Sequence, residues 1–194
     1  MGQRHDLSRV LQVGELLFRR QGYHHTGVEE ILSKTDFPRS SFYYHFKSKE
    51  GFGKAALEYY SENILAMMRK CFQDPSEESY LQRLQNYFYM IADYNVSNSF
   101  NSCCLIQRMA IEEGSAPGEL QEAARKQFGR WFVVTEKCMQ QAQDRGEVRA
   151  DISADRLTRM VFDLVYGEST LSRVDREAEN FKSSLDTFFQ LIRR

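Results

Sequence analysis

The stretch from Pro38 to Phe52, PRSSFYYHFKSKEGF, gathers phenols, hydroxyls, an imidazole and cations within fifteen residues. Phe42 and Phe46 are four residues apart, so on a helix they share one face and can anchor it. The outward positions are then Ser40, Tyr43 and Tyr44. Such a surface suits a groove of double-stranded DNA, because serine does not obstruct approach and a tyrosine hydroxyl can donate to a phosphate. Arg39 can reach a phosphate or a guanine edge.

Helix start and stop signals surround this stretch. Thr26-Gly27-Val28-Glu29 predicts a capping box at the start of a short helix, in which the Thr hydroxyl and the Glu carboxylate satisfy exposed backbone N–H groups. TDFP at 35–38 interrupts the helical pattern, and Pro38 can open the next helix near its first position. Ser48 is a good N-cap for the helix after that, whose first N–H groups could hold one more phosphate. Two short helices joined by a tight turn form a helix-turn-helix.

Helical periodicity continues through almost the whole chain, and no segment alternates long enough to indicate a strand. An apolar stripe from Leu7 to Phe18 predicts the first helix, with Gly22 as its stop. The later helices are predicted over about 38–46, 50–71, 80–94, 103–112, 119–145, 155–171 and 175–192. The sequence therefore predicts an all-α fold, with a three-helix helix-turn-helix domain at 1–50 and a larger helical domain at 51–194.

Charge and composition limit the classes of binding partner, location and activity that the sequence allows. The chain carries 26 Lys and Arg against 27 Asp and Glu, but residues 1–50 alone have eight cations and six acids. The excess favours an anionic partner at the N-terminal end. No secretory signal or membrane span is visible, and the four cysteines lack a disulfide framework, so we expect a cytoplasmic protein that does not contact a membrane. No phosphate loop, metal motif or nucleophile motif occurs, so neither an enzyme nor a cofactor or metal site is expected.

A family resemblance rests on these same residues. Thr26-Gly27-Val28, then Ile31, then DFPRSSFYYHFKSKE at 36–50 resembles the DNA-binding signature of the TetR/AcrR family of bacterial repressors, over about residues 7–60. The resemblance implies a homodimer that binds double-stranded DNA at a palindromic operator, and a small-molecule inducer of unknown identity. The chain departs from the usual pattern: Pro38 and Ser40 replace Ser and Gly, and Glu29 stands where a basic residue is frequent.

The resemblance also implies roles for single residues in DNA binding. Tyr43 and His45 would contact phosphates, and Arg39 and Tyr44 would contact base edges. Thr26 and Lys49 would grip the DNA backbone at the margins. The full set of predicted contacts is Thr26, Arg39, Ser40, Ser41, Tyr43, Tyr44, His45 and Lys49. The alternatives are that Tyr44 belongs partly to the core and that His45 is only an exposed residue at a helix end.

The larger domain is expected to dimerise and to bind the effector. By resemblance, the helices at about 119–145 and 155–172 form a four-helix bundle with a second subunit. The predicted interface strip is Leu157, Met160, Val161, Leu164 and Val165. The predicted pocket lining is Tyr87, Met90, Tyr94, Cys104, Phe128, Trp131, Phe132 and Met139. Ordinary core packing is the alternative for each pocket residue, because a helical core and an effector pocket share the same composition.

Two adjacent cysteines suggest a second mode of regulation. The segment NSCCLIQRMAIEE at 101–113 resembles the Gly-Cys-Leu stretch of a family branch that includes the N-ethylmaleimide-responsive repressor NemR. In that branch the cysteine at the helix start senses electrophiles or oxidants. Cys104 takes this position and Cys103 replaces the glycine, and a helix N-terminus favours the thiolate. The alternatives are two small apolar residues in a packed helix start and, for the whole chain, a helical ligand-binding or redox-sensing protein without specific DNA binding.

Overall fold

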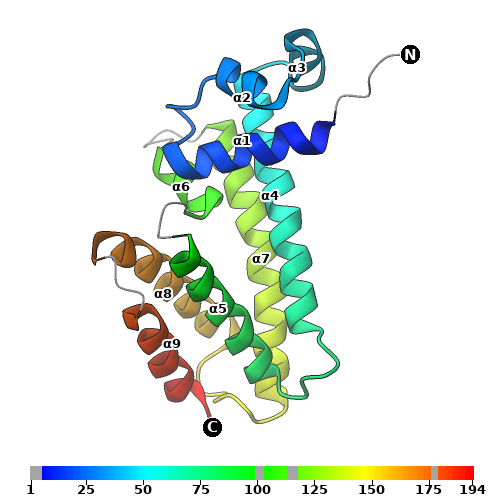
Figure 1. Ribbon diagram of the computed structural model, residues 1–194. Coiled ribbons are helices and arrows are strands. Elements are labelled where there is room, and N and C mark those ends of the chain that lie inside the picture. The colour runs from blue at the N-terminus through cyan, green and yellow to red at the C-terminus, as the bar shows by residue number, and fades with distance from the viewer. Residues whose placement is uncertain (1–5, 99–102, 113–117, 176–178) are drawn as a thin grey trace. The chain divides into compact units, whose positions relative to one another are not determined.

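The computed structural model describes residues 6–98, 103–112, 118–175 and 179–194, which fold into helices joined by short connections (Figure 1). The helices are α1 Leu7–Gln21, α2 Val28–Thr35, α3 Arg39–Phe46, α4 Lys49–Phe72, α5 Tyr80–Ser97, α6 Leu105–Glu112, α7 Glu119–Asp144, α8 Ala154–Asp175 and α9 Glu179–Ile192. Within these ranges β pairing is limited to a single antiparallel bridge between Val148 and Arg193. The predicted all-α fold is confirmed. Among the described helices, none combines the length and apolar character needed to cross a bilayer.

The chain divides into two compact units. The first contains the described residues of 1–64 and 102–128, and the second those of 65–101 and 129–194. This division differs from the predicted boundary at residue 50. Helix α4 continues without interruption past that boundary, and α6 packs against α1, so a segment distant in sequence joins the first unit.

Capping residues set the ends of the first helices. Helix α1 begins after Asp6, whose carboxylate accepts from the N–H groups of Ser8 (2.9 Å) and Arg9 (3.3 Å). It ends at Gly22, which has φ +97° and whose N–H donates to Phe18 O, as the predicted stop requires. Ser48 Oγ accepts from Gly51 N at 3.0 Å and so caps α4, which confirms the predicted N-cap.

The predicted capping box at residues 26–29 is wrong. The N-cap of α2 is Gly27, and no side chain caps this helix. Thr26 is fully buried, and its hydroxyl donates to Gly22 O at 2.6 Å. The Glu29 carboxylate pairs with Arg39 instead of returning to the helix start. The Thr26 hydroxyl stabilises the turn after α1 by its hydrogen bond to Gly22 O, so it does not cap α2.

An aromatic cluster holds the three short helices of the first unit together. Phe52 at the start of α4 is fully buried, with its ring centroid 5.9 Å from Phe18 of α1 and 5.0 Å from Phe42 of α3. Phe46 adds a T-shaped contact to Phe52 at 4.9 Å. Gly14 lies directly against the Phe52 ring, where a Cβ would collide with it. Helix α3 is therefore fixed on its inward face, as the Phe42 and Phe46 spacing predicts.

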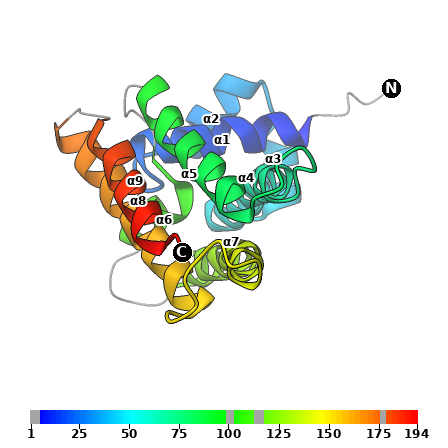
Figure 2. The same cartoon turned by 90° about the horizontal axis from the view of Figure 1, so that it is seen from below.

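The second unit is a layer of longer helices. Helices α8 and α9 run side by side and α5 packs against both (Figure 2). The core includes Phe88, Phe162 and Phe189, with the Phe88 ring 5.9 Å from Phe162 and 6.3 Å from Phe189. Helix α5 runs three residues beyond its predicted end at 94, because Asn95 is buried and its side chain donates to Ile91 O. Helix α8 likewise continues to Asp175, beyond the predicted 171.

Candidate nucleic-acid interface and thiol site

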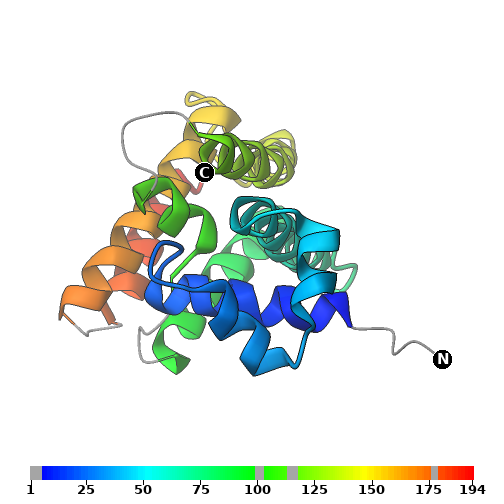
Figure 3. The same ribbon diagram turned by 90° about the horizontal axis from the view of Figure 1, so that it is seen from above.

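Helix α3 presents a polar surface, and Figure 3 looks onto the end of the first unit that carries α2 and α3. Phe42 is fully buried, whereas Tyr44 is 72% exposed and Tyr43 is 38% exposed. Arg39, Ser40 and His45 are also exposed, and Ser41 is half-buried. The alternative in which Tyr44 belongs to the core is wrong. The exposed side chains can donate hydrogen bonds to phosphates and base edges from a helix anchored by aromatic packing.

The Arg39 guanidinium is held by two neighbours. It forms an ion pair with Glu29 of α2, and its Cζ lies 5.6 Å from the centroid of the Tyr43 ring. The ion pair is largely exposed, so water and salt screen it. The sequence did not predict the pair, although Glu29 was recognised as an unusual acidic residue at this place. A carboxylate beside Arg39 restricts the directions in which the guanidinium can reach DNA.

Two lysines flank the junction of α3 and α4. Lys47 Nζ donates to Tyr44 O at 2.7 Å and lies 5.3 Å from the centroid of the Tyr44 ring. Lys49 Nζ lies 4.5 Å from the Tyr23 ring centroid and donates to His24 O at 3.4 Å. Partial burial lowers the pKa of Lys49, and the Glu112 carboxylate opposes this shift. Both lysines extend the donor surface of α3 beyond its last residue.

Thr26 differs from the other predicted DNA contacts. Its hydroxyl is buried and already donates to Gly22 O, so it supports the turn between α1 and α2 and cannot offer that proton to a phosphate. The remaining seven predicted contacts lie on α3 or at the start of α4. Sequence reasoning missed Glu112 of α6, which accepts from the backbone of the same turn. Its position 89 residues after Tyr23 gave no local signal.

The residues predicted to line an effector pocket are divided between the two units. Cys104 and Phe128 belong to the first unit, and the other six belong to the second. Tyr87, Trp131 and Met139 are buried, and the Tyr87 ring lies 5.1 Å from both Phe72 and Phe88. Phe132 and Met90 are half-buried, and Tyr94 is 43% exposed. Tyr87 therefore serves the helical core, which was the stated alternative.

A surface depression of about 410 Å³ lies elsewhere in the second unit. Arg69, Lys70, Gln73, Asp74 and Pro75 line it, at the end of α4 and the start of the following loop. None of the predicted pocket residues belongs to this lining.

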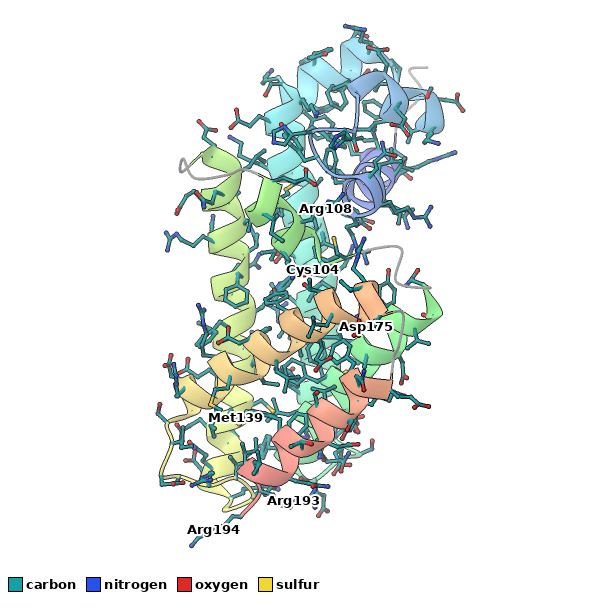
Figure 4. All side chains as sticks on the ribbon, turned by 90° about the vertical axis from the view of Figure 1, so that its left-hand side faces the viewer. Cys104, Arg108, Met139, Asp175, Arg193 and Arg194 are labelled. Carbon is teal, nitrogen blue, oxygen red and sulfur yellow. The ribbon has the colours of Figure 1, made fainter. Side chains whose placement is uncertain are left out.

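The two adjacent cysteines lie immediately before α6. Figure 4 shows Cys104 at the start of this helix and Arg108 one turn further along. Arg108 N donates to Cys104 O at 2.9 Å, so Cys104 occupies the N-cap position. Both thiols are half-buried. The predicted place of Cys104 at a helix N-terminus is thus confirmed, one residue later than the predicted helix start.

Cys103 contacts α1, the first helix of the first unit. Arg19 Nε of α1 donates to Cys103 O at 2.9 Å, and the Cys103 thiol donates to Arg19 O at 3.5 Å. The Arg19 guanidinium lies 5.1 Å from the Tyr60 ring centroid and 3.5 Å from the Glu15 carboxylate. Burial raises the pKa of Tyr60 well above its ordinary value, and its interaction with Cys104 adds to the shift. Cys104 is therefore part of a buried polar cluster that joins α1, α4 and α6.

The other two cysteines, Cys71 and Cys138, have thiol pKa values raised by burial. Burial raises the pKa of Cys71, opposed by Lys70. It raises the pKa of Cys138 to about 12, and Cys138 is only 2% exposed. Because the thiolate is the reactive form, both thiols are poorer nucleophiles at neutral pH than an ordinary cysteine.

The predicted dimer strip on α8 splits into two faces. Leu157 and Val161 are fully buried and Val165 is almost so, because they pack inside the subunit. Only Met160 (39% exposed) and the half-buried Leu164 remain open to a partner. Leu171 (55%) and Val174 (75%) extend them. The outer stripe of Met160, Leu164, Gly167, Leu171 and Val174 repeats at alternating spacings of four and three residues, as a helix-packing seam requires.

Comparisons with known proteins cover both units. The family model described as "Bacterial regulatory proteins, tetR family" matches residues 10–56, and "Tetracyclin repressor-like, C-terminal domain" matches residues 81–188. The chain is 25% identical over 183 residues to the transcriptional repressor DhaR of Mycobacterium sp. (strain GP1), covering 94% of this chain and 90% of that protein. It is 31% identical over 148 residues to the transcriptional regulator AcuR of Cereibacter sphaeroides, covering 76% of this chain and 67% of that protein.

Solved structures share the fold. A regulatory protein TetR from Rhodobacter sphaeroides superposes with a TM-score of 0.88 at 25% identity, covering 98% of this chain and all of that chain. The reduced form of Escherichia coli NemR gives a TM-score of 0.82 at 21% identity, covering 93% of each chain. The similarity therefore extends over both units.

Proposed function

The chain belongs to the TetR family of bacterial regulatory proteins and is a DNA-binding transcriptional regulator, and from that premise we propose that it acts as a homodimeric repressor on a palindromic operator. The observation that carries the proposal is the exposed row of hydroxyl, phenol and cationic side chains on α3, fixed from behind by Phe42 and Phe52. In this role α3 enters the major groove of each half-site.

Each exposed side chain has a part in this docking. Tyr43 and His45 donate to phosphates, and Ser40 and Ser41 permit close approach of the helix backbone. Arg39 and Tyr44 reach base edges, with the Arg39 guanidinium aimed by Glu29. Lys49 and the N-terminus of α4 hold a phosphate at the margin of the half-site.

The outer stripe of α8 supports the dimer. Met160, Leu171 and Val174 are apolar and exposed on a single chain, and burial against a second copy removes them from water. A two-fold dimer presents two α3 helices to successive major grooves roughly 34 Å apart, which requires a palindromic site.

Release from DNA is assigned to an unknown small-molecule inducer or to modification of Cys104. The polar cluster supports the thiol route, because Cys103 is bonded to Arg19 of α1 and Cys104 interacts with Tyr60 of α4. An adduct on Cys104 needs space that this cluster occupies, so it favours a different placement of α1 and α3. By linkage, operator binding must weaken binding of the inducer by the same factor by which the inducer weakens operator binding.

The test is selection of duplexes from a random-sequence library by the purified protein, followed by affinity measurements over a salt series. A selected palindrome whose affinity falls steeply with salt is expected, because binding releases counterions from the phosphates. Treatment with N-ethylmaleimide should abolish binding in the wild type and leave Cys104→Ser binding intact. Equal loss of binding in both proteins refutes the thiol route, and failure to select any duplex refutes operator binding.

A further inference from the structure

Helix α6 ends in a carboxylate that binds the turn between α1 and α2. Glu112 Oε2 accepts from Tyr23 N at 2.7 Å and from His24 N at 3.3 Å. Arg108 Nε, one turn earlier on the same helix, holds Oε1 at 2.5 Å. The Glu112 side chain also fills the space beside Gly22, where a Cβ would collide with it.

The turn needs an acceptor at this place. Helix α1 stops at Gly22, whose backbone at φ +97° turns the chain out of the helix. The next two N–H groups therefore point away from the α1 carbonyls and are satisfied by Glu112. A buried N–H without an acceptor is costly, and a carboxylate is a stronger acceptor than a neutral group. Glu112 thus completes the turn between α1 and α2, within the three-helix domain that contains the helix-turn-helix.

The same turn positions a predicted DNA contact. The Tyr23 ring is buried, with its centroid 5.3 Å from that of Phe18, and the Lys49 ammonium lies 4.5 Å from the same ring. Lys49 Nζ also donates to His24 O. Tyr23 and His24 therefore bind Glu112 through their N–H groups and Lys49 through the ring and the carbonyl. A shift of the turn moves Lys49 with it.

We propose that Glu112 is a positioning residue for DNA binding, although it lies outside the segment 10–56 that matches the DNA-binding family model. It fixes the turn after α1 and, through Tyr23 and His24, the place of the Lys49 ammonium. The effect on DNA rests on the phosphate contact proposed for Lys49 above. The effect on the turn does not depend on DNA.

Charge repulsion alone predicts the opposite change in DNA affinity when the Glu112 carboxylate is removed. A carboxylate close to Lys49 repels phosphates, so its removal should tighten DNA binding at low salt. The two roles are separated by Glu112→Gln, which removes the charge, and Glu112→Asp, which keeps the charge but shortens the side chain by one methylene. Positioning predicts that both variants weaken binding. Charge alone predicts tighter binding for the glutamine variant and wild-type binding for the aspartate variant.

The experiment compares both variants with the wild type on the duplex that the wild type selects. The control is Glu122→Gln, which removes an exposed α7 carboxylate paired with Arg125. Circular dichroism establishes that each variant is folded. We expect about a tenfold loss of affinity for both Glu112 variants, the equivalent of one charge-assisted hydrogen bond, and no loss for the control. Wild-type or tighter binding by the Glu112 variants overturns the proposal.

Amide hydrogen exchange on the protein without DNA provides the second readout. Exchange at Tyr23 and His24 should accelerate in both Glu112 variants and stay unchanged in the control, because the Glu112 carboxylate accepts from both of these N–H groups. Unchanged exchange in both Glu112 variants overturns the proposal. A wild type that selects no duplex refutes the proposed operator binding instead, and the exchange result still decides whether Glu112 holds the turn.

Discussion

Thiol chemistry offers a prediction whose magnitude follows from the structure. Burial raises the pKa of Cys138 by three pH units, from the ordinary 9.0 to about 12. At neutral pH this lowers its thiolate population by about a thousandfold. A thiolate of higher pKa is intrinsically more nucleophilic. With a Brønsted slope of about 0.45, the rate constant of the Cys138 thiolate is roughly twentyfold higher, which offsets part of the loss in thiolate population. The net retardation is about fiftyfold before access is considered, and the 2% exposure of Cys138 increases it.

The assay is alkylation of the native protein by N-ethylmaleimide at pH 7.5, with timed quenching and peptide mass spectrometry. Cys138 in the native protein should react at least about fiftyfold more slowly than the same thiol in denatured protein, and the half-buried Cys103 and Cys104 should react faster than native Cys138. Cys103→Ser and Cys104→Ser assign the adducts within their shared peptide. Denatured protein serves as the control, since its four cysteines should react at similar rates. Native Cys138 reacting within about tenfold of its own rate in denatured protein would refute the reasoning, because burial would then not govern its reactivity.

Three further changes test the architecture. Phe52→Ala should lower the free energy of unfolding by about 3–5 kcal/mol, because removal of a fully buried ring that contacts α1 and α3 leaves a cavity. Urea unfolding followed by circular dichroism measures this free energy. A loss below about 1 kcal/mol would contradict the packing. Leu171→Glu should convert a dimer to folded monomers in sedimentation velocity. Ile111→Glu, at a position on α6 that is more exposed (71% against 55%), should not. A dimeric Leu171→Glu protein would argue against the outer stripe. Glu29→Gln should strengthen non-specific DNA binding by roughly two- to tenfold and broaden the set of duplex sequences selected from a random library, because Arg39 loses its ion pair. If the variant selects the same duplex sequences as the wild type, the ion pair does not orient Arg39.

Local sequence signals predicted most helices and several of their ends. Gly22 and Ser48 act through neighbours three or four residues away, and the Phe42 and Phe46 spacing decides which face of α3 is buried. The Asp6 cap acts over two and three residues but was not predicted. Such effects are contained in a short window of sequence, so periodicity and capping preferences suffice to predict them. The polar character of the α3 surface followed directly, because the side chains that do not pack must face water.

Tertiary contacts decided the rest. Thr26 and Glu29 fit a capping box by sequence. In the folded chain the Thr26 hydroxyl instead donates to the α1–α2 turn, and the Glu29 carboxylate forms an ion pair with Arg39. Leu157 and Met160 are both apolar residues of one helix, and only packing against the rest of the second unit shows that the first is core and the second is surface. Tyr87 fitted core and pocket equally well until its neighbours were known.

The sequence by itself determined the class of fold, the helix-turn-helix and the polar outward surface of α3, because these depend on helical periodicity and on residues close together in the chain. Only the tertiary structure revealed that Glu112 and Cys103 belong to the DNA-binding unit, since they meet Tyr23 and Arg19 across more than eighty residues. Contacts at that separation leave no local pattern. They arise because α6 must bury its apolar face against α1, and that packing brings a carboxylate and a thiol to α1 and the turn that follows it.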